Sequence, residues 1–204
     1  MAAAQSAGRG RHGNVWTSVP GNLYASLLLR PWPGDRAGDY SFILALALHA
    51  AVACFLPDPT LLKIKWPNDL LLDGRKCAGI LLESPEPGVL LAGMGVNLVS
   101  APEGRAFLND YATVSVSPDS LLMCLEPALT AWVDLYRARG LVPILAEWQT
   151  KAAGVGEAVR VRLPQETFDG VWAGIDDQGA LRVRLSDGSE RRVLSGEVFF
   201  GDDV

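Results

Sequence analysis

Three short stretches of the chain hold residues that could do chemistry on an anion. The first is QSAGRGRHG, residues 5–13, in which glycines and arginines alternate. The second is KWPND, residues 65–69, which is followed seven residues after its aspartate by Lys76. The third is GMGVN, residues 93–97. Cationic side chains beside glycine backbone can bring guanidinium and ammonium groups close to a carboxylate or a phosphate.

The Gly-Arg stretch has two interpretations. Such an alternation occurs in disordered nucleic-acid-binding tails, and it also occurs in tight loops that present guanidinium groups to a small anion. The chain carries 18 Lys and Arg against 23 Asp and Glu, a formal net charge of −5. Because a non-specific nucleic-acid binder relies on a positive surface, this balance favours the loop and predicts no nucleic-acid partner.

Length and composition are those of an ordinary globular protein. The 204 residues are 49% hydrophobic and 20% charged, enough for one domain or for one domain with a small appendage. The longest apolar run, residues 42–56, has 15 residues and is shorter than the roughly 20 that a membrane span needs. The first residues lack the apolar core of a signal peptide, and the three cysteines are far apart. We therefore predict a soluble, cytoplasmic protein with reduced thiols and no membrane partner.

Hydrophobic periodicity and turn signals predict the elements that must position the three stretches. Extended chain is expected at 22–31, 60–84 and 88–98, with a hairpin turn at Asp73-Gly74, and helices are expected at 41–56, 117–140 and 143–152. Asp39 stands where it could cap the first helix, and Ser117, with Pro118 after it, where it could cap the second. Pro127 lies inside the second helix and should kink or split it.

Past Gly154 the hydrophobic period changes to two. Alternating segments, EAVRVRL, FDGVWAGI, ALRVRL and RRVLSG, are separated by the polar stretches PQET, DDQG and SDGS. Short strands joined by tight turns are typical of a small β-barrel or a curled sheet. We expect a domain boundary near residue 153, with one domain at 1–153 and a second at 154–204.

Taken together, in this order and followed by a short β-domain, the three stretches resemble the biotin protein ligases, which attach biotin to carboxylase carrier domains. The similarity runs over essentially the whole chain. It implies an α+β fold: a mixed sheet with flanking helices, related to the class II aminoacyl-tRNA synthetases and biotin synthetase-like, followed by an SH3-like small β-barrel. It also implies that biotin and ATP form biotinyl-5′-AMP and that biotin then passes to a lysine of the carboxyl carrier domain, with Mg²⁺ as cofactor.

The resemblance also implies roles for individual residues. Arg11 and Lys76 match the two cations that act in catalysis. The residues matching those that contact biotin are Gln5, Arg9, Gly10, Arg11, Lys76 and Gly79. The residues matching those around ATP and the adenylate are Trp16, Asn68, Asp69 and Asn97, and Asp69 is also the expected Mg²⁺ ligand. His12 and His49 are expected to be non-catalytic, and Trp66 fits a core position and a site position equally well.

The chemistry explains why cations are needed there. A carboxylate must attack the α-phosphate of ATP, and two unit anions about 4 Å apart repel by roughly 4 kcal/mol at an effective dielectric constant near 20. Left uncompensated, that repulsion slows the step by on the order of a thousandfold. Fixed positive side chains between the two groups remove the repulsion and stabilise the charge that develops during transfer.

Departures from the family pattern keep other functions open. The chain begins at residues matching the segment after the family's Ser-Thr-Asn motif, which grips the ureido ring of biotin, so we expect that motif to be absent. We also find no N-terminal helix-turn-helix, which disfavours a repressor. The alternatives are a lipoate or other acyl-protein ligase of the same fold and a truncated, non-catalytic biotin-binding relative. A homodimer is compatible with the resemblance, because exposed strand edges in the family often serve dimerisation.

Overall fold

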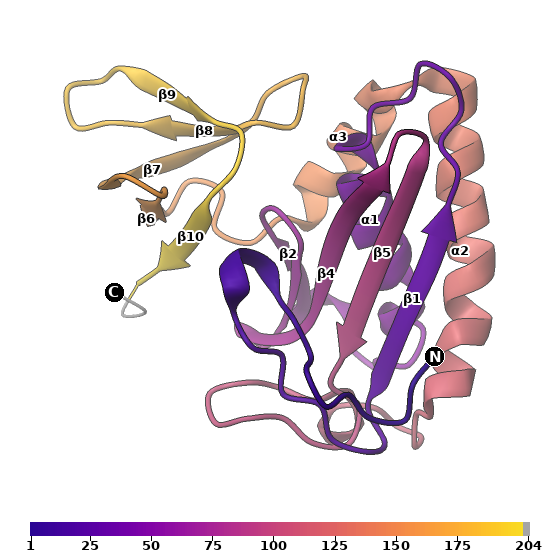
Figure 1. The fold of residues 1–204 in the computed structure, drawn as a ribbon. Coiled ribbons are helices and arrows are strands. Elements are labelled where there is room, and N and C mark those ends of the chain that lie inside the picture. The colour runs from indigo at the N-terminus through magenta and orange to yellow at the C-terminus, as the bar shows by residue number, and fades with distance from the viewer. Residues whose placement is uncertain (202–204) are drawn as a thin grey trace.

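The computed structural model describes residues 1–201, with the side chain of His12 excepted. The N-terminal sheet consists of β1 (Leu23–Leu29), β2 (Leu62–Lys65), β3 (Asp69–Leu72), β4 (Arg75–Glu86) and β5 (Val89–Val96). These strands lie in the order β1-β5-β4-β3-β2, and each neighbouring pair is antiparallel (Figure 1). The extended segments predicted from the sequence are confirmed, although their ends differ: β1 and β5 are shorter than predicted, and β4 continues to Glu86.

Short connections explain the pairing of β2, β3, β4 and β5. β3 and β4 are joined by the turn at Asp73 and Gly74, which have positive φ angles of 51° and 73°. A two-residue hairpin turn of this kind needs positive φ, and Asp-Gly supplies it. A mixed sheet was expected, but in the described residues parallel pairing is confined to an isolated bridge between Ile64 and Ala152. Short connections of this kind join antiparallel neighbours, which accounts for the ladders between β2, β3, β4 and β5, whereas β1 pairs antiparallel with β5 although α1 and three strands separate the two in the sequence.

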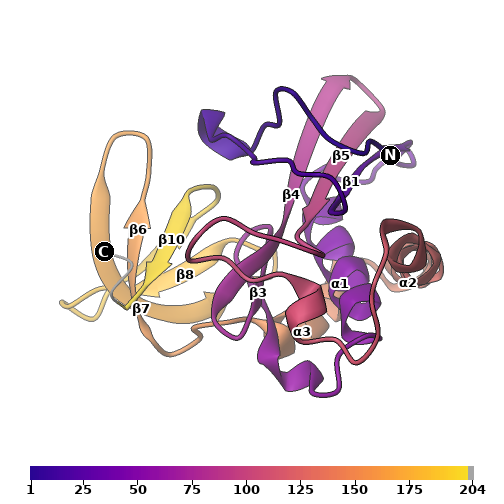
Figure 2. The same ribbon diagram turned by 90° about the horizontal axis from the view of Figure 1, so that it is seen from below.

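Three helices cover one face of the N-terminal sheet: α1 (Asp39–Ala53), α2 (Pro118–Arg139) and α3 (Leu141–Lys151). α1 is apolar on nearly all sides, and it packs against β2, β3 and β4 as well as against the other two helices. Figure 2 shows α1 and α2 on the same side of the sheet. Within residues 1–201, no helix has the length and apolar character needed to cross a membrane.

The cap predicted for α1 is wrong. Asp39 is the first residue of the helix, and Gly38 holds the N-cap position without a side-chain cap. The Asp39 carboxylate is buried, accepts a hydrogen bond of 2.9 Å from the Tyr136 hydroxyl, and lies 3.4 Å from Nε of Arg36. Asp39 therefore joins α1 to α2 instead of capping the start of α1.

The start of α2 is as predicted, and the helix continues past its internal proline. The Ser117 hydroxyl accepts a hydrogen bond of 3.2 Å from the Ser120 amide, which makes Ser117 a true N-cap. Pro127 does not split the helix, which runs unbroken over Pro118–Arg139. Residues on both sides of the proline, Leu121, Leu125 and Tyr136, are buried in the core, and this packing holds the two halves together.

The C-terminal sheet consists of β6 (Ala158–Arg162), β7 (Thr167–Ile175), β8 (Leu181–Arg184), β9 (Glu190–Val193) and β10 (Glu197–Phe200). Its order is β10-β6-β7-β8-β9, again with antiparallel neighbours. The final strand, β10, was not among the predicted alternating segments. The inward side chains that form the apolar face of the C-terminal sheet are Val159, Val161, Trp172, Leu181, Val183, Val193 and Val198.

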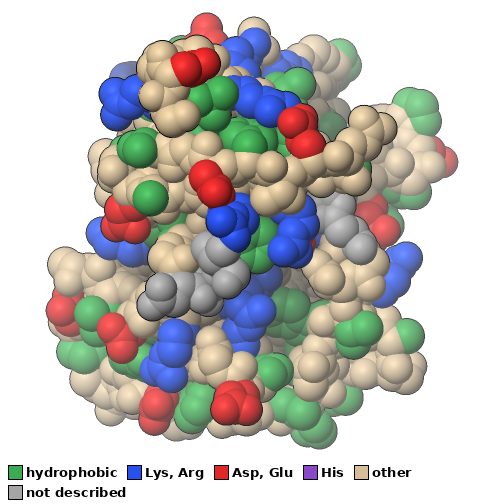
Figure 3. Space-filling view, turned by 90° about the vertical axis from the view of Figure 1, so that its left-hand side faces the viewer, with side chains coloured by type: hydrophobic (Ala, Val, Ile, Leu, Met, Phe, Trp, Pro, Cys, Tyr) green, Lys and Arg blue, Asp and Glu red, His purple; other side chains and the backbone are tan. Residues whose placement is uncertain are grey.

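The outer surface of this sheet carries charges of both signs. Arg160 pairs with Asp169 at 2.7 Å, and Arg182 pairs with Glu190 at 2.6 Å. Figure 3 shows Lys and Arg side chains near the middle of the face on this side of the molecule, with Asp and Glu side chains among them. The arginines of the sheet are therefore largely balanced by neighbouring carboxylates.

Aromatic rings join the two sheets. Phe42 of α1 contacts Trp148 of α3, with ring centroids 5.5 Å apart, and Trp148 lies 6.4 Å from Trp172 of β7. Trp172 in turn stacks on Phe200 of β10 at 5.9 Å. This continuous apolar row means that the C-terminal sheet is packed onto the helical layer and not merely linked to it.

Candidate active site

The Gly-Arg loop, residues 8–16, folds back on itself as a narrow hairpin. The Trp16 amide donates to the Gly8 carbonyl at 3.0 Å, and the Gly10 amide donates to the Asn14 carbonyl at 2.7 Å. A Cβ at Gly8 would collide with the Trp16 carbonyl, and Gly13 has a φ of 80°. Gly8 is therefore needed for close approach of the backbone, and Gly13 is needed for its positive φ.

The tip of this loop directs Arg11 at the KWPND motif. Nη1 of Arg11 donates to Oδ1 of Asn68 at 3.2 Å and to the Gly196 carbonyl at 3.5 Å. Burial lowers the pKa of the guanidinium, while the carboxylates of Asp69 and Glu197 raise it. A half-buried arginine held in this way is a fixed positive charge.

A β-bulge brings Lys76 to the same place. Asp69 is opposite Gly79 across β3 and β4, but Leu71 is opposite Lys76, because the register shifts by one residue between them. Without the extra residue, Lys76 would lie on the other face of the sheet from Asp69. With it, Nζ of Lys76 lies 2.6 Å from Oδ2 of Asp69.

Two glycines form a flat platform beside this pair. Gly79 of β4 and Gly95 of β5 are directly opposite each other in the sheet. The Trp16 indole covers both, since a Cβ at Gly95 would be 2.5 Å from the ring and a Cβ at Gly79 would be 3.2 Å from it. The Lys76 ammonium lies 5.6 Å from the centre of the same ring. Among the described residues, the buried Trp16 Nε1 has no hydrogen-bond partner.

Asn68 is held in place by β4. Its backbone carbonyl accepts from the Ile80 amide at 3.0 Å, and its side-chain amide donates to the Ile80 carbonyl. The preceding Trp66-Pro67 peptide bond is cis. Asn68 and Asp69 therefore connect the two cations: one residue binds Arg11, and the next binds Lys76.

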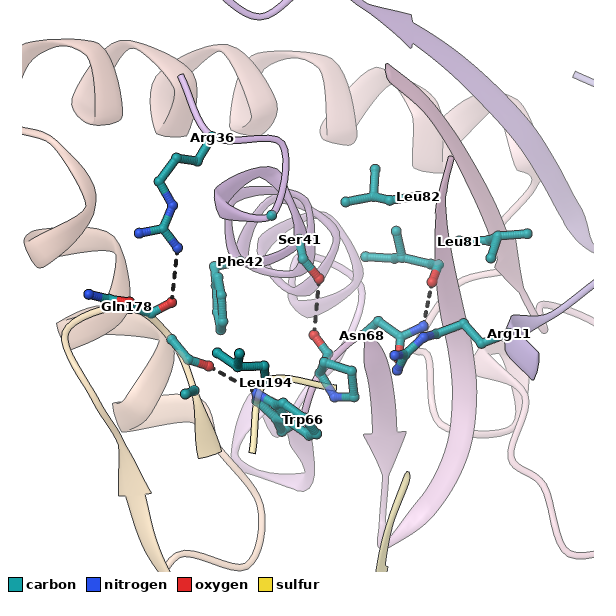
Figure 4. A pocket seen from close by; sticks show the side chains of 15 residues that line it. Arg11, Arg36, Ser41, Phe42, Trp66, Asn68, Leu81, Leu82, Gln178 and Leu194 are labelled. Carbon is teal, nitrogen blue, oxygen red and sulfur yellow. Dashed lines mark hydrogen bonds between the residues drawn. The ribbon is translucent and has the colours of Figure 1, made fainter. Parts of the chain in front are cut away.

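A cavity of about 430 Å³ opens beside Arg11 and Asn68. Its walls come from α1, from β4 and from the C-terminal sheet, as Figure 4 shows. The lining residues that the sequence did not indicate include Arg36, Ser41, Phe42, Leu82, Gln178 and Leu194. None of them belongs to a recognisable motif, so only the folded chain brings them to the site.

Other predicted residues lie apart from this centre. Gln5 is exposed and accepts a hydrogen bond of 2.8 Å from the Ser18 hydroxyl. Arg9 is exposed and lies 3.5 Å from the Glu83 carboxylate. Asn97 is buried, and its amide donates to the Ala106 carbonyl at 3.1 Å.

Of the two histidines that we expected to be non-catalytic, His12 has a side chain that lies outside the described residues. His49 is buried in α1, with Nε2 3.2 Å from the Leu62 carbonyl oxygen.

The expected Mg²⁺ ligand is already engaged by protein. Asp69 faces the Lys76 ammonium, and residues 1–201 contain no group of three or more His, Cys, Asp or Glu side chains arranged to hold a metal ion. Mg²⁺ usually keeps several waters and binds through substrate phosphates with one or two carboxylates. A protein-only magnesium site therefore does not fit these residues, and the ATP phosphates would have to supply most of the ligands.

Comparisons with known proteins agree along the whole chain. Residues 1–98 match the biotin/lipoate A/B protein ligase family, and residues 154–201 match the biotin protein ligase C terminal domain. A biotin--[acetyl-CoA-carboxylase] ligase of Paracoccus denitrificans is 41% identical over 98% of this chain and 89% of its own length. One of Mycobacterium tuberculosis is 34% identical over 89% of this chain and 71% of its own length.

Longer relatives and a solved structure match as well. The bifunctional ligase/repressor of Escherichia coli is 30% identical over 97% of this chain, which spans 64% of that protein. The biotin protein ligase of Aquifex aeolicus, solved in complex with biotin and ATP, superposes with a TM-score of 0.85 at 25% identity, covering 97% of this chain and 85% of that one. The α+β fold expected from the sequence is thereby confirmed. The sequence matches, the shared fold and the placement of the Gly-Arg loop against KWPND together show that this chain belongs to the biotin protein ligase family.

Proposed function

We propose that the chain is an ATP-dependent biotin protein ligase that forms biotinyl-5′-AMP and transfers biotin to a lysine of a carboxylase carrier domain. The observation that carries this proposal is the convergence of Arg11 and Lys76. They come from segments 65 positions apart in the sequence, yet they bind the adjacent residues Asn68 and Asp69. Two fixed cations close together can offset the repulsion between the biotin carboxylate and the α-phosphate of ATP, the two anions that the first step must join.

In the first step, a carboxylate oxygen of biotin attacks the α-phosphorus of ATP, and pyrophosphate leaves. Arg11 and Lys76 would neutralise the approaching carboxylate and the phosphate, which removes a repulsion of roughly 4 kcal/mol. Lys76 is held by Asp69 and Arg11 by Asn68, so neither charge has to be reoriented as the reaction proceeds. In the second step, the carrier lysine amine attacks the activated carbonyl carbon, AMP leaves, and the amine loses a proton.

The glycine platform supports a place for biotin. Gly79 and Gly95 present backbone without side chains next to Lys76, and Trp16 provides an apolar surface over them. An apolar ring system can lie against such a surface while its carboxylate reaches the cations. Arg9 and Gly10 belong to the Gly-Arg loop, and Gln5 precedes it. We propose that these three residues contact biotin from the loop side.

The adenylate would lie next to Asn68 and Asp69, and the cavity of about 430 Å³ is within the usual range for small-molecule sites.

The contacts of Asn97 favour an indirect role in the site. Its side chain holds Ala106, and the Ala106 amide donates to the Lys76 carbonyl at 3.1 Å. We therefore propose that Asn97 braces the backbone of Lys76.

The domain division also stays a proposal. We assign residues 1–153 to catalysis and residues 154–204 to an accessory domain. The change from α3 to β6 within this region and the range of the C-terminal family match support the division.

The test is a two-stage assay of the purified chain. Pyrophosphate release with biotin and ATP reports the first step, and mass spectrometry of a carboxyl carrier domain reports the second. Lipoate added as competitor separates biotin from lipoate specificity, because a lipoate ligase would prefer lipoate in both stages. Equal background rates for the wild type and an Arg11→Gly variant would instead favour a non-catalytic binding relative.

A further inference from the structure

The turn between β7 and β8, residues 176–180, contacts the KWPND motif directly. Nε1 of Trp66 donates to the Gly179 carbonyl at 3.1 Å, and Trp66 is only 2% exposed. Gly179 also lies against the ring of Phe42, where a Cβ would collide with it, and its φ is 80°. Trp66 and Phe42 thus form a socket that accepts a glycine at this point of the C-terminal sheet.

The turn that enters this socket is stiff. The Asp176 carboxylate accepts hydrogen bonds from the amides of Gln178 and Ala180, each at 2.9 Å, and pairs with Arg192. The Gly179 amide donates to the Asp176 carbonyl at 3.0 Å. Because the turn is braced internally, holding one carbonyl in it holds the whole turn.

The position of this turn shapes the cavity beside the reacting groups. Gln178, Gly179 and Ala180 form one wall, and Trp66 lies on the wall next to it, as Figure 4 shows for the labelled residues. Two residues beyond Trp66, Asn68 binds Arg11. One indole N–H therefore connects the C-terminal wall of the cavity to the segment that places the catalytic cation.

We propose that Trp66 is a positioning residue: its N–H fixes the 176–180 turn against the motif, sets the width of the cavity and thereby supports adenylate formation without touching the reacting atoms. The inference rests on the proposed ligase function. It also decides between the two roles that the sequence left open for Trp66, because a residue that only filled the core would act through its ring alone.

Trp148 provides a matched control. It belongs to the aromatic row that joins the two sheets, next to Phe42, and like Trp66 it is buried, but its Nε1 has no hydrogen-bond partner among the described residues. Trp66→Phe and Trp148→Phe both replace an indole by a smaller ring. Only the first leaves a buried carbonyl without its donor.

The experiment compares these two variants with the wild type at a temperature where all three are fully folded. Amide hydrogen exchange of residues 176–180 reports the turn, pyrophosphate release gives kcat and the KM for ATP, and calorimetry gives the Kd for biotin. In Trp66→Phe we expect exchange in the turn to be about tenfold faster and kcat/KM for ATP to be about tenfold lower, with the biotin Kd unchanged. In Trp148→Phe we expect both quantities to stay within twofold of the wild type.

Two results would overturn the inference. One is the same exchange rate in the two variants, which would mean that the indole N–H does not hold the turn. The other is faster exchange in Trp66→Phe with unchanged kcat and KM, which would make Trp66 a purely structural residue. If the wild type itself formed no adenylate, the proposed function would fail, and the exchange comparison would still decide whether Trp66 anchors the turn.

Discussion

The indole of Trp16 lies against the backbone of Gly95, so closely that a Cβ on Gly95 would be 2.5 Å from the ring. Gly95 faces Gly79 across the ladder, and the same indole approaches both. The second glycine of the GMGVN stretch, residues 93–97, thus has a specific structural role. It leaves room for an aromatic ring that the Gly-Arg loop supplies.

The first prediction is that Gly95→Ala displaces Trp16. The added methyl group overlaps the indole, and overpacking of this kind costs about 1–3 kcal/mol unless the ring moves away. We expect a change in tryptophan fluorescence and a loss of biotin affinity of about tenfold or more, measured by calorimetry. Gly93→Ala is the control, because the nearest atom to a Cβ there is 3.7 Å away. Equal behaviour of the two variants would show that Trp16 does not lie on Gly95 in solution.

The second prediction concerns Arg11. Replacing it by glycine removes the cation that Asn68 holds, and the rate of pyrophosphate release should fall by on the order of a thousandfold. Arg160→Gly removes an exposed arginine of the C-terminal sheet that is paired with Asp169, and it should keep the wild-type rate. A loss of less than fivefold in Arg11→Gly would contradict the proposed part of Arg11 in adenylation.

The third prediction is that Lys76 and Asp69 act as a coupled pair. Their side chains are 23% and 21% exposed, and Nζ and Oδ2 are 2.6 Å apart. Lys76→Met should lower pyrophosphate release by at least about a hundredfold, and Asp69→Asn should lower it less, because the ammonium remains. In the double variant the losses should not add, with a coupling of about 0.5–3 kcal/mol. Additive losses in this double-mutant cycle would show that the two residues act independently; Lys63→Met, on the exposed side of β2, is the control.

The parts of the fold that the sequence predicted correctly have strong local signals. Asp73-Gly74 adopts the positive φ angles that its residue types favour, and Ser117 caps α2 through a hydrogen bond with Ser120, only three residues further along the chain. For Asp39 the local sequence suggested an equally plausible role as the N-cap of α1, and this prediction was wrong. The Asp39 carboxylate instead accepts a hydrogen bond from Tyr136, 97 residues away, and a local sequence pattern does not reveal tertiary contacts of this kind.

The site followed the same rule. Arg11, Asn68, Asp69 and Lys76 come together in the structure, but the bulge that turns Lys76 toward Asp69 has no marker in the sequence. The cavity wall formed by the turn at Gln178 was also unforeseen, because it depends on how the C-terminal sheet packs against α1 and α3. Motifs pointed to the four side chains that contact one another, and packing determined what surrounds them.

The last prediction is a pH dependence of stability that originates at His49. The pKa of its imidazole falls from 6.5 to about 4, chiefly because of burial; the ammonium groups of Lys151 and Lys63 act in the same direction, and the bond to the Leu62 carbonyl opposes the change. The unfolded chain therefore takes up a proton on His49 at a higher pH than the folded chain does. Stability from the neutral, buried imidazole is fully present above about pH 6.5 and is lost as the pH falls toward about 4.

The measurement is urea unfolding of the wild type and His49→Gln between pH 7.5 and pH 4. Glutamine can still donate to the Leu62 carbonyl but does not titrate, so the variant should lose less stability over this range. A pKa change of this size corresponds to about 3 kcal/mol, and other titrating groups such as Asp39 are common to both proteins and cancel in the difference. The free-energy difference between the two proteins should therefore shift in favour of His49→Gln as the pH falls. A difference that stays constant from neutral to acidic pH would mean that His49 is solvated in the folded state and that α1 is less tightly packed against β2 than the structure shows.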